Sequence, residues 1–194
     1  MKLKFCVTLL GGLLLGFVAR GQQVAVKSNL LYDATATVNV GVELGLAPRW
    51  TLDVSGNYNG WNMSGERRWK HWLVQPEARY WFCERFGGHF LGFHLLGGQY
   101  NVGGVDTGIK FLGTDFSKLK DYRYQGWAVG AGVAYGYAWV LGRHWNLEAE
   151  LGVGYAYTRY DTFRCVGCGK RISRDKPHHY VGPTKAAINL VYVF

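Results

Sequence analysis

The stretch QGWAVGAGVAYGYAWVL at residues 125–141 alternates strictly between two kinds of side chain. One kind is apolar and mostly large, and comprises Trp127, Val129, Ala131, Val133, Tyr135, Tyr137, Trp139 and Leu141. The other kind is only glycine or alanine, from Gly126 to Gly136. This two-residue period predicts a β-strand, because successive side chains of a strand point to opposite faces. Small residues on one face suit the interior of a narrow barrel, which leaves little room for side chains.

The same alternation recurs on both sides of this stretch. Residues 38–46 place valine and leucine at even positions, and residues 145–157 place apolar and aromatic residues at odd ones. We predict eight strands, near residues 24–32, 38–46, 50–58, 70–82, 89–101, 124–141, 145–158 and 185–194. Short connections (47–49, 83–88 and 142–144) alternate with long polar ones (59–69, 102–123 and 159–184). This pattern predicts an all-β, eight-stranded antiparallel up-and-down transmembrane barrel of the outer-membrane type.

The charged residues indicate which face of each strand lies inside. They fall on the face that carries the small residues: Lys27, Glu43, Asp53, Glu77, Arg79, Glu148, Glu150 and Lys185. A water-soluble barrel is the rival architecture, but it would turn its charges outward. Large apolar side chains facing water around the whole circumference would cause aggregation, which favours the membrane barrel. The strand at 89–101 mixes apolar residues on both faces, so its faces stay unassigned.

Aromatic residues gather near both ends of the predicted strands. One group flanks the short turns: Trp50, Trp81, Phe82, Phe90, Trp139 and Trp145. A second group lies toward the long loops: Tyr32, Tyr58, Trp61, Trp72, Tyr100 and Trp127. Amphipathic rings prefer the level of the lipid headgroups, so we expect two aromatic girdles.

The N-terminus has the layout of a targeting segment. Lys2 and Lys4 precede the apolar run at 5–18, and the small residues of Ala19-Arg20-Gly21 follow it. This order is typical of a secretory signal peptide, here cleaved before Gln22. The run is shorter than the roughly 20 residues that a transmembrane helix needs. We predict a signal peptide over 1–21 and a single outer-membrane barrel domain over 22–194.

Composition agrees with a single folded domain. The chain has 194 residues, of which 48% are hydrophobic, 16% aromatic and 18% charged. These fractions exclude a disordered protein, and four cysteines are too few for a disulfide-dense scaffold. The formal net charge of +9 indicates partners that carry negative charge.

The C-terminus carries an apolar stripe formed by Ile188, Leu190, Tyr192 and the terminal Phe194. It resembles the signal, here Tyr192 and Phe194, by which the barrel-assembly machinery recognises outer-membrane barrels. The chain over 22–194 further resembles a family of small outer-membrane β-barrel proteins of uncharacterised function. That resemblance rests on CVGCGK at 165–170, GPTKA at 182–186 and the terminal strand. The family occurs in Gram-negative anaerobes, often encoded near fimbrial genes, so the resemblance implies an integral outer-membrane location and a fimbrial or other envelope partner.

Four residues form a candidate metal site, which comprises Cys165, Cys168, His178 and His179. Two thiolates and two imidazoles match the ligands of tetrahedral Zn²⁺. A redox-active pair is a second interpretation of the Cys-x-x-Cys motif. The interpretation we favour is a disulfide between Cys165 and Cys168 that stiffens an exposed loop.

The long loops carry more bases than acids. The basic residues that we expect to bind anions are Arg67, Arg68, Lys70, Arg164, Lys170, Arg171, Arg174 and Lys176. Loops outside an outer membrane meet the phosphates and acidic sugars of lipopolysaccharide, to which this charge would be attracted. Nucleic acid would also fit the charge but not the expected location.

Catalysis finds little support in the sequence. Glu148 and Glu150 share a face about 7 Å apart, a spacing that acid–base chemistry can use, but nearby cations favour a neutralised plug. Lipid-modifying outer-membrane enzymes use a serine with a histidine and an acid, and no histidine at 71, 89, 94 or 144 has an adjacent serine. We therefore expect a non-enzymatic structural or interaction platform without a cofactor. The alternative function is a lipid-modifying enzyme.

Overall fold

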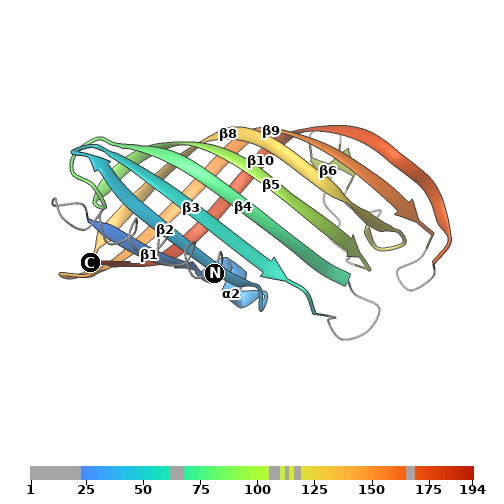
Figure 1. Ribbon diagram of the computed structural model, residues 1–194, viewed down its shortest axis with the longest axis horizontal. Helices are drawn as coiled ribbons and strands as arrows, with labels where there is room; N and C mark the ends of the chain where they lie inside the picture. Colours follow the sequence, from blue (N-terminus) through green and yellow to red (C-terminus); the bar gives the residue numbers. More distant parts are fainter. Residues whose placement is uncertain (1–22, 62–67, 105–109, 112–113, 116–118, 165–168) are drawn as a thin grey trace, which may run out of the picture.

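The computed structural model describes residues 23–61, 68–104, 110–111, 114–115, 119–164 and 169–194, and its long strands form one closed barrel. The ring order is β1, β10, β9, β8, β5, β4, β3, β2, so each strand pairs antiparallel with its neighbour in the chain and β1 closes on β10. The strands are β1 (Val24–Asn29), β2 (Val38–Ala47), β3 (Trp50–Asn59), β4 (Arg68–Trp81), β5 (Gly88–Gly103), β8 (Arg123–Val140), β9 (Trp145–Phe163) and β10 (Arg171–Val193). The predicted all-β, eight-stranded up-and-down barrel is confirmed (Figure 1).

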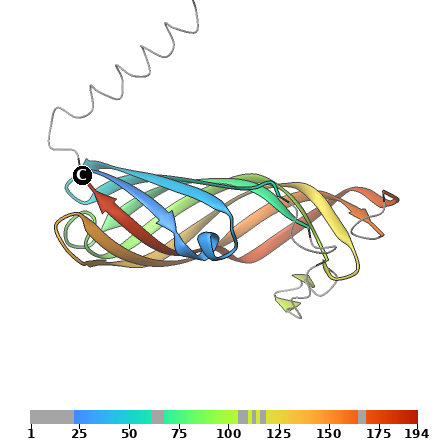
Figure 2. The same cartoon turned by 90° about the horizontal axis from the view of Figure 1, so that it is seen from below.

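Minor elements lie at the end of the barrel that carries the long connections. Helix α2 (Leu30–Ala34) joins β1 to β2, and a small hairpin of β6 (Lys110–Phe111) and β7 (Thr114–Asp115) lies between β5 and β8. The C-terminus lies at the opposite end, with the short turns (Figures 1 and 2). In the described part of the chain, no helix has the length and apolar character to cross a membrane.

The alternation seen in the sequence becomes an inside and an outside. The eight charged residues predicted for the inner face are all buried in the barrel, whereas the apolar residues of the other face are exposed around it. In β5 the even positions 90, 92 and 94 are buried and the odd positions 91, 93 and 95 are exposed. The structure therefore assigns the faces of this strand, which the mixed pattern of apolar residues left open.

The last hairpin differs most from the prediction. Strand β9 continues to Phe163 and β10 begins at Arg171, so most of the expected long loop at 159–184 is paired strand. We call residues 157–163 of β9 and 171–181 of β10 the extended hairpin. Polar side chains occur on both of its faces, so its sequence lacks the apolar alternation that marks the other strands.

Exposed aromatic rings lie near both ends of the barrel, as predicted for part of the two groups, while their place at the level of lipid headgroups stays a prediction. Exposed rings at the short-turn end belong to Trp50, Phe82, Trp139 and Trp145, and those at the other end to Tyr58, Trp61, Trp72 and Trp127. The prediction is wrong for Trp81 and Phe90, which are completely buried, and for Tyr100, whose hydroxyl lies 2.6 Å from Thr158 Oγ1. All three occupy inward positions of the alternation, so proximity to a strand end does not decide which way a ring points.

An aromatic plug fills the barrel at the short-turn end. The ring centroids of Trp81 and Phe90 lie 4.7 Å apart, and Phe86 packs against Trp81 from the β4–β5 turn. Phe86 has a positive φ of 62°, a conformation that L-residues rarely adopt. The amide nitrogen of Asn146 donates to the Phe86 carbonyl at 2.6 Å, which holds the turn inside the barrel. This end is therefore sealed by packed side chains.

Candidate functional site: the charged interior and the cavity at the long-connection end

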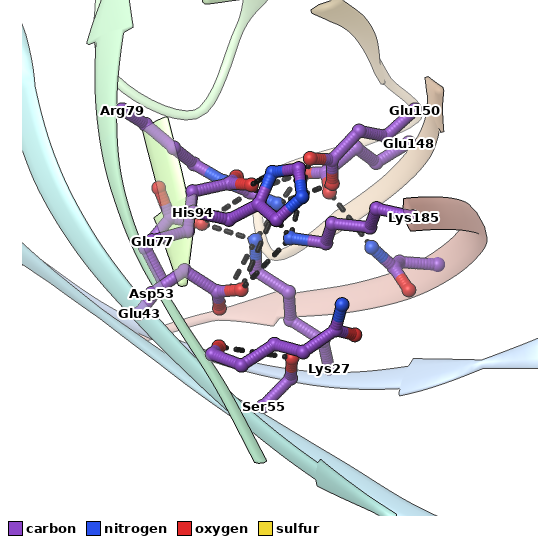
Figure 3. A network of polar contacts seen from close by, with 12 residues as sticks. Lys27, Glu43, Asp53, Ser55, Glu77, Arg79, His94, Glu148, Glu150 and Lys185 are labelled. Atoms are coloured by element: carbon purple, nitrogen blue, oxygen red, sulfur yellow. Dashed lines mark hydrogen bonds and ion pairs between the residues drawn. The ribbon is translucent and has the colours of Figure 1, made fainter. Parts of the chain in front are cut away.

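The charged interior gathers side chains from most of the barrel strands. It holds five carboxylates (Glu43, Asp53, Glu77, Glu148 and Glu150) and three cations (Lys27, Arg79 and Lys185). Each has at most 8% of its surface exposed. They converge on the axis because each lies at an inward position of its strand (Figure 3).

Arg79 is the centre of this cluster. Its Nε lies 2.5 Å from Glu77 Oε1, and its Nη2 lies 2.7 Å from Glu150 Oε2. Its Nη1 lies 2.9 Å from Glu43 Oε2 and 3.0 Å from Glu148 Oε2. Asp53 Oδ2 lies 3.7 Å from Nη2. One guanidinium therefore contacts all five carboxylates, which its planar set of N–H donors allows.

The two lysines complete the pairing from opposite sides of the arginine. Lys27 forms ion pairs with Glu43, with Glu148 at 3.3 Å and with Asp53 at 3.6 Å. Lys185 lies 2.9 Å from Glu77 Oε2 and 3.2 Å from Glu150 Oε1. Every carboxylate thus pairs with two or three cations. Pairing of this kind offsets the large cost of removing charges from water.

Glycines make room for the cluster. A Cβ atom on Gly92 would lie 2.6 Å from the carboxyl carbon of Glu77, and one on Gly152 would lie 2.9 Å from His94 Cε1. The small residues opposite the apolar face are therefore required by the volume of the charged side chains. A cavity of about 30 Å³ beside the cluster, lined in part by Lys27, Asp53 and Asn57, has room for little more than one water molecule.

His94 belongs to the interior and was not among the predicted site residues. Its Nε2 lies 2.8 Å from Thr184 Oγ1, and its Nδ1 lies 3.6 Å from Glu77 Oε2 without a hydrogen-bond partner. A hydroxyl, an imidazole and a carboxylate in this order resemble a catalytic triad. The separation between imidazole and carboxylate exceeds a hydrogen bond, so nothing orients the ring as a base. His94 lies four residues after Phe90 and therefore on the same face of β5. The sequence could have indicated its inward position only if the inner face of this strand had been known.

A second hollow lies where several strands approach their long connections. It has a volume of about 600 Å³ and is lined by β3, β4, β5, β8, β9 and β10. The lining follows three consecutive cross-strand rows. The middle row lies at inward positions of the alternation and comprises Asn59, His71, Tyr100, Gly126 and Tyr160, whereas the rows on either side of it lie at outward positions. We call this hollow the long-end cavity.

The predicted anion-binding residues are only partly in loops. Arg68 and Lys70 lie in β4, and Arg171, Arg174 and Lys176 lie in β10, so the assignment of these five to loops is wrong. Strand pairing continues beyond the apolar segments, because backbone hydrogen bonds do not depend on side-chain polarity. Arg164 and Lys170 do lie in the β9–β10 connection, where the Arg164 N–H donates to the Lys170 carbonyl at 3.3 Å. Arg67 lies outside the described residues.

The extended hairpin is tied together by two exposed ion pairs. Arg159 Nη1 lies 2.9 Å from Asp175 Oδ2, and Arg171 Nη1 lies 2.9 Å from Asp161 Oδ2. The backbone N–H of Asp175 donates to Asp161 Oδ1 at 2.8 Å. This backbone hydrogen bond, together with Arg171, lowers the pKa of Asp161, which is therefore ionised at neutral pH.

The candidate metal site stays a prediction. Cys165 and Cys168 lie outside the described residues, and among those described no group of three or more histidine, cysteine, aspartate or glutamate side chains is placed to hold a metal. His179 Nδ1 lies 2.5 Å from the Tyr155 hydroxyl, whereas the ring of His178 lies near Tyr160. As successive residues of β10, the two imidazoles occupy opposite faces.

Replacing both Cys165 and Cys168 with serine should leave the barrel folded. Both positions lie in the chain between the end of β9 at Phe163 and the start of β10 at Arg171. We expect the free energy of unfolding to change by less than about 0.5 kcal/mol, as for other surface substitutions. Heat-modifiable migration in gels measures folding, with Cys83→Ser in the β4–β5 turn as the control. Loss of the folded band in the double variant alone would contradict this placement.

The state of the two thiols is read from the mass of the unreduced protein. A deficit of about 2 Da, the two hydrogens lost on oxidation, indicates a disulfide. Bound zinc with free thiols indicates the metal site instead.

Comparison with protein families gives one result. A family model described as "Protein of unknown function (DUF3575)" matches residues 6–194. No curated protein matches the chain.

Proposed function

The chain belongs to the DUF3575 family, and we propose that it is an integral outer-membrane barrel that neither catalyses a reaction nor conducts solutes. In this role it is a rigid platform that presents basic side chains at its long-connection end to lipopolysaccharide. A fimbrial or other envelope protein is a further partner of the same surface. The filled, charge-paired interior is the observation that carries this proposal.

The outer surface supports the membrane location. Leu151 is 71% exposed, Val153 58% and Val133 49%, and similar apolar side chains surround the barrel. A water-soluble protein rarely exposes a continuous apolar surface of this extent. Lipid would cover it, and the closed ring leaves no unpaired strand edge within the bilayer. The predicted signal peptide and C-terminal stripe agree with export and barrel assembly.

The interior supports the absence of a conducting path. The aromatic plug fills the short-turn end, and the paired charges fill the section next to it. An ion crossing the barrel would have to displace Arg79 from its five carboxylates. The interior of an eight-stranded barrel is just wide enough to be filled by side chains. The small number of strands therefore explains why the interior is filled.

Conductance and binding experiments test the two parts of the proposal. The refolded protein in planar bilayers should show no discrete channels, and persistent unitary currents would contradict a closed interior. Lipopolysaccharide vesicles should bind the protein with an affinity that falls as salt rises. The double variant Arg174→Gln with Lys176→Gln should bind several-fold more weakly. The matched control is Arg49→Gln with Arg143→Gln at the short-turn end, which should bind like wild type.

Replacing Phe194 with serine should impair membrane assembly. The aromatic ring is 69% exposed and packs edge-on to Tyr192 at 4.9 Å, while the backbone N–H of Phe194 bonds to the Val24 carbonyl. Serine keeps the backbone bond and removes the ring, so recognition rather than stability should suffer. The yield of folded protein in the outer-membrane fraction should fall several-fold, with precursor in the periplasm. Leu141→Ser, also at the short-turn end, is the control, and equal yields would contradict an assembly signal.

The alternative function, a lipid-modifying enzyme, rests on the contact between His94 Nε2 and Thr184 Oγ1. His94 is 1% exposed, so a lipid ester would have to enter the packed interior to reach it. Release of fatty acid from phospholipid or lipopolysaccharide by the refolded protein, abolished in Thr184→Val, would establish the enzyme and overturn the platform.

A further inference from the structure

Three cations on the outside of the barrel have no anionic partner. Arg68 and Lys70 lie at outward positions of β4, and Arg123 lies at an outward position of β8. In the part of the chain that the structure describes, no carboxylate forms an ion pair with any of them. Asp161, on the neighbouring β9, already pairs with Arg171. Like charges that gather on one face of a sheet repel one another, so an anion from outside the chain would stabilise this group.

The strand register places these cations on both sides of β5. Strands β4, β5 and β8 lie side by side in the ring, and Gly103 of β5 pairs with Arg68 on one side and Arg123 on the other (Figure 1). A Cβ atom on Gly103 would lie 2.9 Å from the Arg123 Cα atom, so only glycine fits between them. The two arginines are two strand spacings apart, about 10 Å between Cα atoms. One phosphate above the glycine would therefore be within reach of both guanidinium groups.

Arg123 is held in place with its donors unused. Its guanidinium carbon lies 3.9 Å from the centroid of the Phe163 ring, and the residue is only 8% exposed. Stacking occupies the face of the guanidinium and leaves the N–H groups at its edge for an acceptor. The Nε atom is buried and has no hydrogen-bond partner. A phosphate oxygen is an acceptor that arginine binds with strong, charge-assisted hydrogen bonds.

The next outward residue of β5 has an unused acceptor. Asn101 lies between Lys70 and Gln125 in the register, and its Oδ1 atom is buried without a hydrogen-bond partner. Buried acceptors normally have a donor. A hydroxyl or amide N–H of a sugar that carries the phosphate would supply it.

Toward the middle of the barrel the same surface becomes apolar. Gln99 and Gly97 are the next outward residues of β5, and the side chains that flank them are Trp72, Val74, Trp127 and Val129. These four side chains are 40–48% exposed. A Cβ atom on Gly97 would meet no atom within 4 Å, so the space above it is open. We call the outward residues 97–103 of β5, with their neighbours in β4 and β8, the β5 strip.

The order of groups along the β5 strip is that of a membrane lipid. Tryptophan prefers the level of the headgroups, and Gly103 lies four residues beyond Gln99, about 14 Å along the strand. The cations are therefore on the water side of the tryptophans, and Gly97 is on the hydrocarbon side. The outward side chains of the strip are separate from the inward residues of the long-end cavity, such as Tyr100.

From this order we propose that the β5 strip binds lipopolysaccharide by its lipid part, with a phosphate between Arg68 and Arg123 and an acyl chain above Gly97. A free phosphate or a nucleic acid would contact the cations alone and leave the open apolar part of the strip uncovered. The proposal rests on the proposed function for the membrane location. It adds a binding site on the barrel wall that is distinct from Arg174 and Lys176 in β10.

Binding is tested on the full chain, folded in detergent, by native mass spectrometry with defined lipids. The probes are diphosphorylated lipid A, the same lipid A after enzymatic removal of its phosphates, and phosphatidylglycerol. Dephosphorylation should weaken binding to the wild type about tenfold. Arg68→Gln with Arg123→Gln should weaken binding of the phosphorylated form about tenfold and leave binding of the dephosphorylated form unchanged. Arg49→Gln with Arg143→Gln, at the short-turn end, is the matched control and should bind like wild type.

A second pair of variants tests the apolar part of the strip. Gly97→Leu fills the open space and should weaken binding of both forms of lipid A several-fold. Gly142→Leu is the matched control, because a Cβ atom on this glycine at the short-turn end also meets no atom within 4 Å. Heat-modifiable migration shows that each variant is folded. Arg68→Gln with Lys70→Gln keeps Arg123 on Phe163 and replaces the first double variant if that variant does not fold.

The outcomes separate this site from the platform function. Weaker binding of phosphorylated lipid A in the arginine variant, with binding unchanged in its control, supports the β5 strip. No binding of lipid A to folded protein, equal binding of its two forms, or unchanged binding in the variants overturns it. Tighter binding of phosphatidylglycerol than of lipid A overturns lipopolysaccharide as the occupant. Binding of intact lipopolysaccharide that is lost only in the Arg174/Lys176 double variant overturns the strip and leaves the platform function standing. Channel currents would overturn the platform and leave the lipid measurement valid.

Discussion

Arg79→Met is expected to lower the free energy of unfolding by at least about 3–5 kcal/mol, the loss typical when one partner of a buried ion pair is removed. The interior already holds two more carboxylates than cations, and Arg79 is the single group that contacts all five. Without it, Lys27 and Lys185 are the only cations left in the described cluster. Methionine fills much of the volume, so the loss reports charge rather than a cavity.

Reversible urea unfolding in lipid vesicles measures this effect. Arg159→Ala removes an exposed arginine that pairs with Asp175 and should cost no more than about 1 kcal/mol. Arg79→Lys tests geometry, because one ammonium group cannot reach five carboxylates as a planar guanidinium does. We expect the free energy of unfolding of Arg79→Lys to lie between those of the wild type and Arg79→Met. A change below about 1 kcal/mol for Arg79→Met would mean that the interior charges are hydrated or protonated rather than paired.

Val153→Arg is expected to cost about 2–4 kcal/mol, the penalty for a charge near the bilayer midplane on the outside of a barrel. Val153 lies in the middle of β9 and points outward with 58% of its surface exposed. In water the same substitution at an exposed strand position would be nearly neutral. The size of the effect therefore measures whether lipid covers this face.

The matched control is Leu141→Arg, which places the same charge at the short-turn end next to β8. Leu141 is 62% exposed, but a position near the interface should cost only about 0–1 kcal/mol. Both variants are compared in the same vesicles by the same urea unfolding. Equal and small costs at the two positions would place the barrel surface in water and contradict the membrane location.

Much of the barrel could be predicted from local pattern. The alternation at 125–141 and 145–157 separates inward from outward residues, because a strand turns every second side chain to the same face whatever lies beside it. That rule alone placed eight charged residues inside, from Lys27 to Lys185, and the structure confirms each of them. The rule gives no signal where polar side chains occupy both faces of a strand, which is why the pattern predicts a loop at 159–184 where the structure has most of the extended hairpin.

Contacts between distant strands could not be predicted in this way. That Arg79 meets Glu43 and Glu148, or that Asn59 and Tyr100 line one cavity, depends on the register of pairing around the closed ring. Register is a relation between segments far apart in the chain, and no single segment contains it. The sequence by itself therefore determined which side chains face inward, and only the tertiary structure decided which of them meet, because closure of the ring sets the height of each strand against all the others.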